Sequence, residues 1–359
     1  MASSYPKYIP SIHYTDEATK LQTLDIWLPR PLSESSPGQT VWIVYIHGGA
    51  WRDPAQTSQC ILPTLKHLFP SSNHSGSKSL DHIAGIASIN YRLSPYESHP
   101  TDPSSTDDAS RNVRHPEHLR DVAKAMEWLR VNYRVGQRFK YFYDFDKDMA
   151  AMRAEEDSKS YGWIGIGHSC GATLWLQYIS KIPFLIGCTP ILGLRTLILL
   201  EGIYDFPGLL EYHSPPQCPP EVAKIYKDFI GGTFGLDPAY WRLPSPAHAP
   251  YGFGEESMGE SMVLCHSDED ELVEWGQVES LVRRLRDCEW RVRGSEWDGV
   301  EVDEGLQGDL ERGEGDSRRG HPRREMFIKK LKGEHDWIWE EGTQIAKLIE
   351  EAVERVFRG

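Results

Sequence analysis

Tyr161-Gly-Trp-Ile-Gly-Ile-Gly-His-Ser-Cys-Gly-Ala-Thr-Leu174 is the stretch that decides the fold of this chain. It begins as a short apolar run, turns at Ser169 and continues into a helix-like segment, residues 172–180. Its centre, Gly167-His-Ser-Cys-Gly171, fits G-x-S-x-G, a pattern typical of a serine on a sharp strand-to-helix turn. At such a turn the residues two positions from the serine nearly touch the backbone, and glycine at both avoids a Cβ clash. The stretch therefore predicts a strained serine, with a helix N-terminus behind it that favours developing negative charge.

A second glycine motif, His47-Gly-Gly-Ala-Trp51, directly follows the apolar run Val41-Trp-Ile-Val-Tyr-Ile46. An acyl-transfer enzyme needs backbone N–H groups aimed at the oxyanion of its tetrahedral intermediate, and side chains would obstruct that approach. Gly48 and Gly49 after a buried strand therefore predict an oxyanion loop, which resembles the H-G-G-G loop of lipases and esterases. We expect His47 to order this loop through its ring nitrogens. Trp51 is expected to form a pocket wall, with an ordinary core aromatic as the alternative.

Apolar strand candidates and helix candidates alternate along the chain. The expected strands are 21–28 (an antiparallel edge strand), 41–46, 83–91, 161–167, 194–201, 261–266 and 326–331, and the expected helices are 57–69, 115–133, 172–180, 221–230, 272–288 and 340–356. This alternation indicates the α/β class: an open, mainly parallel sheet with helices on both faces. We expect a single domain over residues 1–359, with its functional groups at the carboxyl ends of the strands, where the motifs fall.

Two segments depart from this alternation. A Pro-rich run, 213–220, and the helix-like segment after it form a cap-like excursion over about 203–250. The charged, glycine-rich run 294–324 has few apolar residues and is predicted to be a disordered insertion.

Composition excludes several classes of protein. The formal net charge is −14, without a dense basic patch, which argues against a nucleic-acid partner. The six cysteines, at positions 60, 170, 188, 218, 265 and 288, form no C-x-x-C pair, which argues against a zinc site or a disulfide framework. The N-terminus lacks the pattern of a secretory signal, and no apolar run is long enough to span a bilayer. We therefore expect a cytoplasmic protein without a membrane partner.

The serine needs a base, and chain order selects it. A glycine-rich turn with an incidental serine is the plainer interpretation of the first motif, but its strand-then-helix context favours a nucleophile. A serine nucleophile is activated by a histidine that a carboxylate orients, in the chain order Ser, acid, His. Only His321 and His335 lie far enough along the chain. His335 is preferred because it follows an apolar strand and precedes Trp337, whereas His321 lies in the charged insertion.

The acid is expected in the turn after the strand 261–266. Four acidic residues compete there: Asp268, Glu269, Asp270 and Glu271. The turn pattern H-S-x-x-D-x-x-V places Asp270 at the position that relatives of this fold use, and Asp268 is the alternative. His266 and His168 lie beside the chemistry but in the wrong chain order to be the base, and His168 is expected to shape the elbow.

Taken together, these motifs resemble the kynurenine formamidases (arylformamidases) of fungi, on the hormone-sensitive-lipase-like side of the α/β-hydrolases. The shared features are H-G-G-x-W at 47–51, Arg52-Asp-Pro54, Gly-His-Ser-Cys-Gly at 167–171, Glu201-Gly-Ile-Tyr-Asp205 and His266-Ser-Asp-Glu-Asp-Glu-Leu272. The resemblance spans about 20–350 and departs from the family at 70–80, 95–112 and 294–324. It implies an α/β-hydrolase fold with the catalytic triad Ser169, Asp270 and His335. The implied oxyanion donors are the backbone amides of Gly49, Ala50 and Cys170.

The resemblance also implies an activity and a substrate. Members of this family hydrolyse N-formyl-L-kynurenine to L-kynurenine and formate, in tryptophan breakdown toward NAD. The partner is then a small molecule, and the chemistry requires neither a metal nor an organic cofactor. Trp51 and aromatic residues of the excursion, Tyr204 among them, are expected to hold the aryl ring. The sequence itself leaves the oligomeric state open, although enzymes of this family are often homodimers.

Two other functions stay open. Esterases share much of the motif set, so a broad carboxylesterase acting on short acyl esters is the first alternative. A catalytically inactive hydrolase fold that serves as a receptor or scaffold is the second. Such proteins usually lose a member of the triad, whereas all three candidates are present here.

Overall fold

The computed structural model describes residues 5–70, 75–138, 159–251, 259–303 and 324–358. The strands of these residues are β1 (Lys7–His13), β2 (Thr23–Leu28), β3 (Val41–Ile46), β4 (Ile83–Ile89), β5 (Gly162–His168), β6 (Leu194–Leu200), β7 (Ser261–Ser267), β8 (Arg291–Ser295) and β9 (Glu325–Leu331). The α-helices are α1 (Leu62–Leu68), α2 (Glu117–Tyr133), α4 (Cys170–Ile179), α5 (Ile182–Leu185), α6 (Phe206–Tyr212), α7 (Pro220–Phe234), α8 (Gly276–Arg286), α9 (Trp337–Glu341) and α10 (Thr343–Arg358). Short 3-10 turns are η1 (Leu32–Glu34), η2 (Ser58–Ile61), η3 (Lys78–His82) and η4 (Pro238–Tyr240).

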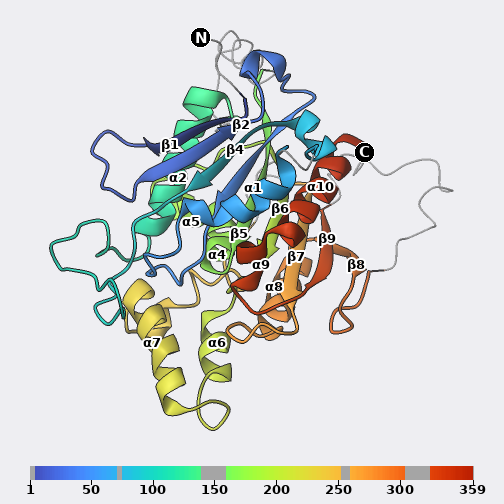
Figure 1. Cartoon of the computed structure of the whole chain (residues 1–359). Coiled ribbons are helices and arrows are strands. Elements are labelled where there is room, and N and C mark those ends of the chain that lie inside the picture. The colour runs from blue at the N-terminus through green and yellow to red at the C-terminus, as the bar shows by residue number, and fades with distance from the viewer. Residues whose placement is uncertain (1–4, 71–74, 139–158, 252–258, 304–323, 359) are drawn as a thin grey trace, which may run out of the picture.

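All of these strands join one sheet in the order β1-β2-β4-β3-β5-β6-β7-β9-β8 (Figure 1). The pairs from β4 to β8 are parallel, and only β1 with β2 and β2 with β4 are antiparallel. The predicted class, an open and mainly parallel sheet with helices on both faces, is confirmed. One detail of the prediction is wrong: β2 is antiparallel, but it lies inside the sheet, and β1 forms the edge.

Strand β3 shows why the centre of the sheet is apolar throughout. Trp42, Val44 and Ile46 pack into the core on one face, and the intervening residues 41, 43 and 45 pack into the core on the other. Successive side chains of a strand point to opposite faces, so a strand covered on both faces needs apolar residues at every position. Helices α2, α4 and α8 contribute to the first core, whereas α1, α9 and α10 contribute to the second.

Two predicted helices differ from the observed ones for local reasons. The helix expected over 272–288 begins only at Gly276, because the Asp270 carboxylate accepts the N–H groups of Leu272 and Val273 and holds them in a turn. The last helix is divided into α9 and α10 at Gly342, whose φ of 79° is left-handed and ends the first segment.

The segment expected to be a disordered insertion is only partly described. Residues 304–323 lie outside the described residues. Residues 294–303, by contrast, are packed, which differs from the expectation. Trp297 stacks on Trp275 at 4.2 Å between ring centroids, Val300 is buried, and Asp303 accepts the N–H of Val292. Two apolar anchors in an otherwise polar run are sufficient to attach this part to the domain.

The edge formed by the carboxyl ends of the parallel strands gathers the motifs. The loop after β3 carries His47, the turn after β5 carries Ser169, and the turns after β7 and β9 carry Asp270 and His335. The segment 203–250, which we call the cap, leaves β6 at this same edge, and its helices α6 and α7 lie beyond the layered sheet (Figure 1). Among the described residues, no helix has both the length and the apolar character needed to cross a membrane.

Candidate active site

Ser169 lies at the turn between β5 and α4, in a conformation that few residues other than glycine adopt. Its φ is 52° and its ψ is −122°, and strain of this kind is often found at functional sites. A Cβ on Gly167 would lie 2.6 Å from the backbone nitrogen of Ala172, and one on Gly171 would lie 2.6 Å from the carbonyl oxygen of His47. Both positions therefore require glycine, which is the physical reason for the G-x-S-x-G pattern.

The loop after β3 is held by an aromatic and an imidazole. The His47 ring stacks on Tyr91 at 4.5 Å and its Nδ1 bonds to the carbonyl of Gly48 at 2.9 Å. Burial lowers the pKa of His47 to about 4, so the ring is neutral and donates from Nδ1. The hydroxyl of Tyr91 donates to the carbonyls of His47 and Gly48. These bonds engage the carbonyls of the first two loop residues, and the His47 ring takes part in them.

The candidate oxyanion donors are the amides of Gly49, Ala50 and Cys170. Within the described part of the chain, no backbone carbonyl accepts the N–H of Gly49 or Ala50, and Cys170 begins α4, where the N–H groups have no partner within the helix. The backbone of Ala50 also interacts with the Cys170 thiol, and the N–H of the next residue, Trp51, donates to its sulfur at 3.3 Å. Burial raises the pKa of Cys170 to about 11, so the thiol is a neutral packing group.

The base and the acid lie together. Nδ1 of His335 is 2.9 Å from Oδ2 of Asp270, and both side chains are almost completely buried. Burial alone would raise the pKa of Asp270, but the hydrogen bond and the charge of His335 outweigh it and hold this pKa below its ordinary value. The carboxylate is thus ionised and accepts the Nδ1 proton, which leaves Nε2 of His335 as the basic nitrogen.

Asp268, the alternative acid, lies elsewhere. It is exposed, pairs with Lys330 at 2.8 Å and accepts the indole N–H of Trp275. Glu271 accepts the backbone N–H of His335 at 3.0 Å, so it positions the loop that carries the base. Of the four acids in the turn, Asp270 has the hydrogen bond to the imidazole.

His168 links the serine turn to the base. Its Nε2 donates to the carbonyl of His335 at 3.0 Å, and the two rings are 4.8 Å apart. Burial lowers the pKa of His168 to about 3, so it is a neutral donor. The Ser169 hydroxyl itself makes no hydrogen bond to any described residue. Such bonds between nucleophile and base often shorten only when substrate binds.

Glu201, for which the sequence suggested no role, is a further carboxyl group at this edge. It follows β6 with a φ of 51°, is fully buried, and neither carboxyl oxygen has a hydrogen-bond partner in the described residues. The Nε2 of the neutral His168 ring lies 3.6 Å from Oε2 of Glu201. Burial, reinforced by the charges of Asp270 and Asp336, raises the pKa of Glu201 to about 10, so it is protonated at neutral pH. An acidic residue at the very end of an apolar strand was the signal in the sequence.

Replacing Glu201 by glutamine is expected to make stability less dependent on pH. Because the folded-state pKa of about 10 lies above the ordinary 4.5, the stabilising contribution is full below about pH 4.5 and is lost toward pH 10. From pH 6 to pH 8 the unfolding free energy of the wild type should fall by about 2–3 kcal/mol relative to that of Glu201→Gln. Urea unfolding at both pH values measures this fall. The exposed Glu279→Gln on α8 is the control, and parallel pH curves for Glu201→Gln and the wild type would contradict the assignment.

Trp51 and Tyr204 do not border accessible space. Both are fully buried, Trp51 among Phe206, Phe229 and Phe234 of the cap and Tyr204 with its N–H bonded to the side chain of Gln277. The structure therefore places them in the core rather than on a pocket wall, and the alternative interpretation of Trp51 as a core aromatic fits. The sequence could not show this, because the cap residues that cover Trp51 lie more than 150 positions away.

In the described ranges of the chain, two groups of three side chains bring potential metal ligands within 4.8 Å of one another: His168, His335 and Asp336, and Glu201, Asp270 and His335. Both groups share His335. In the second group its Nδ1 is already bonded to Asp270, so the atoms that would bind a metal form the Asp–His pair instead. The expectation that the chemistry needs no metal stays a prediction.

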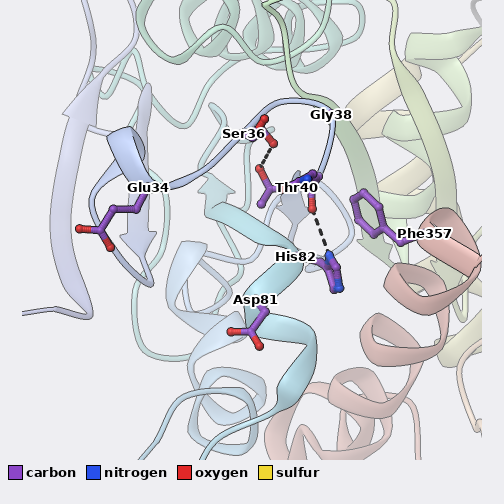
Figure 2. A pocket seen from close by; sticks show the side chains of 8 residues that line it. Glu34, Ser36, Gly38, Thr40, Asp81, His82 and Phe357 are labelled. Atoms are coloured by element: carbon purple, nitrogen blue, oxygen red, sulfur yellow. Dashed lines mark hydrogen bonds between the residues drawn. The ribbon is translucent and has the colours of Figure 1, made fainter.

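A separate hollow of about 380 Å³ lies at the opposite edge of the sheet. Figure 2 shows its lining: Ser36, Gly38 and Thr40 precede β3, His82 precedes β4, and Phe357 comes from the end of α10. His82 stacks on Phe357 and bonds to the carbonyl of residue 39, so this polar group is satisfied. The hollow lies at the amino ends of the strands and does not belong to the Ser169 site.

Comparison with known proteins identifies relatives along most of the chain. A kynurenine formamidase-like hydrolase of Fusarium equiseti is 29% identical over 350 residues, which cover 96% of this chain and 93% of the relative. A kynurenine formamidase of Aspergillus versicolor is 30% identical over 290 residues, covering 76% and 85%. A kynurenine formamidase of Meyerozyma guilliermondii is 30% identical over 252 residues, covering 69% and 73%. No family model matches the chain.

Solved structures show the same fold at low identity. Esterase B of Lactobacillus rhamnosis superimposes with a TM-score of 0.55 at 12% identity, covering 98% of this chain and 87% of that one. A truncated carbohydrate esterase from gut microbiota gives a TM-score of 0.52 at 14% identity, covering 98% of both. These neighbours are α/β-hydrolases, so the chain has the α/β-hydrolase fold.

Proposed function

Because the chain belongs to the kynurenine formamidase family of amide hydrolases, we propose that it hydrolyses N-formyl-L-kynurenine to L-kynurenine and formate through a Ser-His-Asp triad. The observation that carries the proposal is the 2.9 Å hydrogen bond between His335 and Asp270, at the same edge of the sheet as the strained Ser169. Beside Ser169 lie the backbone amides of the loop after β3. A nucleophile, an oriented base and oxyanion donors together are the parts that acyl transfer requires.

The first half of the reaction forms a formyl-enzyme. Nε2 of His335 takes the hydroxyl proton of Ser169 as the oxygen attacks the formyl carbon. The negative charge moves to the formyl oxygen, where the amides of Gly49, Ala50 and Cys170 and the N-terminus of α4 stabilise it. His335 then returns the proton to the aryl nitrogen, and the C–N bond breaks. An arylamine is a better leaving group than an alkylamine, so an esterase-type site is adequate for this amide.

The second half releases formate. Water takes the place of the amine, His335 removes its proton, and the hydroxide attacks the formyl ester of Ser169. The tetrahedral intermediate uses the same amides, and its collapse returns the proton to Ser169 and frees formate. No metal or cofactor takes part. The proposal places the reaction in tryptophan breakdown and in the cytoplasm. The chemistry is compatible with a monomer and with a homodimer.

A carboxylesterase acting on short acyl esters is the second candidate, favoured by the esterases among the structural neighbours. The ratio of kcat/KM for N-formyl-L-kynurenine to that for p-nitrophenyl acetate separates the two functions. We expect this ratio to exceed about 10, because ring and amino-acid contacts lower the barrier only for the larger substrate. A ratio well below one would assign the protein to the esterases.

A further inference from the structure

Arg52 directly follows the loop that carries the oxyanion amides. Its N–H donates to the carbonyl of Gly49 at 2.9 Å, which closes a tight turn and fixes the point from which the side chain leaves. Gly48, earlier in the same loop, is so close to the serine that a Cβ there would lie 3.1 Å from the Cβ of Ser169. The four steps along the backbone from Gly48 to Arg52 span at most about 14 Å even when extended, and the turn shortens this span. The backbone of Arg52 is therefore near the nucleophile.

Two aromatic rings hold the guanidinium. Its Cζ lies 4.0 Å from the ring centroid of Tyr96, in the loop after β4, and 5.7 Å from that of Phe229 on α7. Burial lowers the pKa of Arg52, partly offset by acidic neighbours at longer range, yet a guanidinium stays protonated in proteins. Contact with the rings fixes the plane of the group while its N–H donors stay available at the edge.

The guanidinium lacks an acidic partner in the described part of the chain. Among the described residues, no carboxylate lies within 4 Å of it and no acceptor forms a hydrogen bond with its N–H groups. The nearby carboxylates are engaged elsewhere: Asp53 with the N–H of Ala55, and Asp228 with Lys224. Other shielded arginines differ, since Arg92 binds Asp121 and Arg111 binds Asp102. A partly buried cation whose N–H groups have no acceptor is energetically unfavourable. A ligand with an anionic group can supply the missing acceptor.

Helix α7 connects this cation to the triad. The hydroxyl of Tyr226 donates to the carbonyl of Leu272 at 2.7 Å, two residues after Asp270. One helical turn further on, Phe229 contacts Tyr226 at 5.5 Å on one side and the guanidinium on the other. The turn that contains Asp270 and the guanidinium of Arg52 thus both contact the same stretch of α7. The cap brings them together from positions more than 200 residues apart.

We propose that Arg52 binds the α-carboxylate at the amino-acid end of the substrate, and so selects acyl-arylamines that carry a carboxylate. This proposal rests on the proposed function and names the recognition element that it requires. N-formyl-L-kynurenine has its carboxylate at the end remote from the formyl group, across the aryl ketone. A guanidinium presents two parallel donors to such a group. At neutral pH the protonated α-amino group balances the α-carboxylate, so the substrate has no net charge; long-range electrostatics contribute little to its binding, and a local cation is what can hold the carboxylate.

The test compares two substrates and three variants. The substrates are N-formyl-L-kynurenine and 2-formamidoacetophenone, which keeps the aryl ketone and lacks the amino-acid end. Arg52→Met should raise KM for the first about 10- to 100-fold, with kcat within about threefold, and should leave kcat/KM for the second within about threefold. Arg52→Lys, which keeps the charge and loses the planar fork, should lie between the wild type and Arg52→Met. Lys227→Met removes an exposed cation from α7, the helix that carries Phe229, and should leave the kinetic parameters for both substrates unchanged.

Three outcomes overturn the proposal or separate it from the proposed function. Equal losses for both substrates in Arg52→Met would make the arginine a structural link between loop and cap. Unchanged KM for N-formyl-L-kynurenine would show that the carboxylate binds elsewhere. If the wild type does not hydrolyse N-formyl-L-kynurenine, the proposed function fails. The p-nitrophenyl esters of succinate and butyrate then test Arg52 in the same way, and equal effects on both esters would exclude carboxylate binding.

Discussion

Replacing Ser169 by alanine is expected to lower kcat for N-formyl-L-kynurenine by at least about 10⁴-fold while the protein stays folded. In the proposed mechanism the hydroxyl carries the formyl ester, so without it His335 and the loop amides can at best assist the direct attack of water. The side chain makes no hydrogen bond within the described structure, so its removal leaves no unpaired partner behind. Steady-state kinetics measures the loss, and thermal unfolding verifies the fold.

A covalent probe gives an independent readout of the same substitution. A serine-reactive fluorophosphonate should label the wild type once and should not label Ser169→Ala. Ser267→Ala is the matched control, because Ser267 ends the strand that leads to Asp270 but only accepts the N–H of Glu269. Labelling that survives in Ser169→Ala, or turnover within tenfold of the wild type, would remove Ser169 from the mechanism and would favour a binding role for the fold.

The second large effect is expected for Asp270→Asn, which should lower kcat about 10³- to 10⁴-fold. An asparagine that keeps accepting the N–H groups of Leu272 and Val273 at Oδ1 presents its NH₂ to His335. The imidazole then turns its unprotonated nitrogen to the amide and its proton to Ser169, and in that tautomer it cannot serve as a base. The turn keeps its hydrogen bonds, so the loss should appear in turnover and not in the unfolding temperature.

Asp268→Asn is the matched control for this experiment. It changes the same type of side chain in the same turn, but its carboxylate is exposed and pairs with Lys330. Activity within about twofold of the wild type is expected, because exposed ion pairs contribute little. Near-normal activity of Asp270→Asn combined with loss in Asp268→Asn would move the role of the acid to Asp268.

The local demands of the chemistry made much of this site predictable from the sequence. A serine at positive φ needs small neighbours, so Gly167 and Gly171 mark the turn without knowledge of any distant contact. The chain order of the triad limited fourteen histidines to two candidates, and the apolar strand before His335 decided between them. The parallel sheet then explains why residues 169, 270 and 335 lie at one edge, because the carboxyl ends of its strands share that edge.

What the sequence did not predict depends on packing between distant segments. The protonated state of Glu201 results from burial beside Asp270 and Asp336, and no property of the strand that precedes it reports that burial. Trp51 is covered by cap residues 155 or more positions later. The packing of residues 294–303 depends on contact between Trp297 and Trp275, 22 positions earlier, and a single tryptophan in a polar run does not predict that contact.

The order of the last strands has a consequence for synthesis of the protein. Strand β9 pairs with β7 on one side and with β8 on the other, although both leave the ribosome before it. Until β9 emerges, β8 has no partner among the described strands and His335 is absent, so in the proposed mechanism a nascent chain carries the serine and its oxyanion loop without a base. On that mechanism hydrolysis begins only when the final tenth of the polypeptide has entered the sheet, and a message truncated before that point yields an inert product.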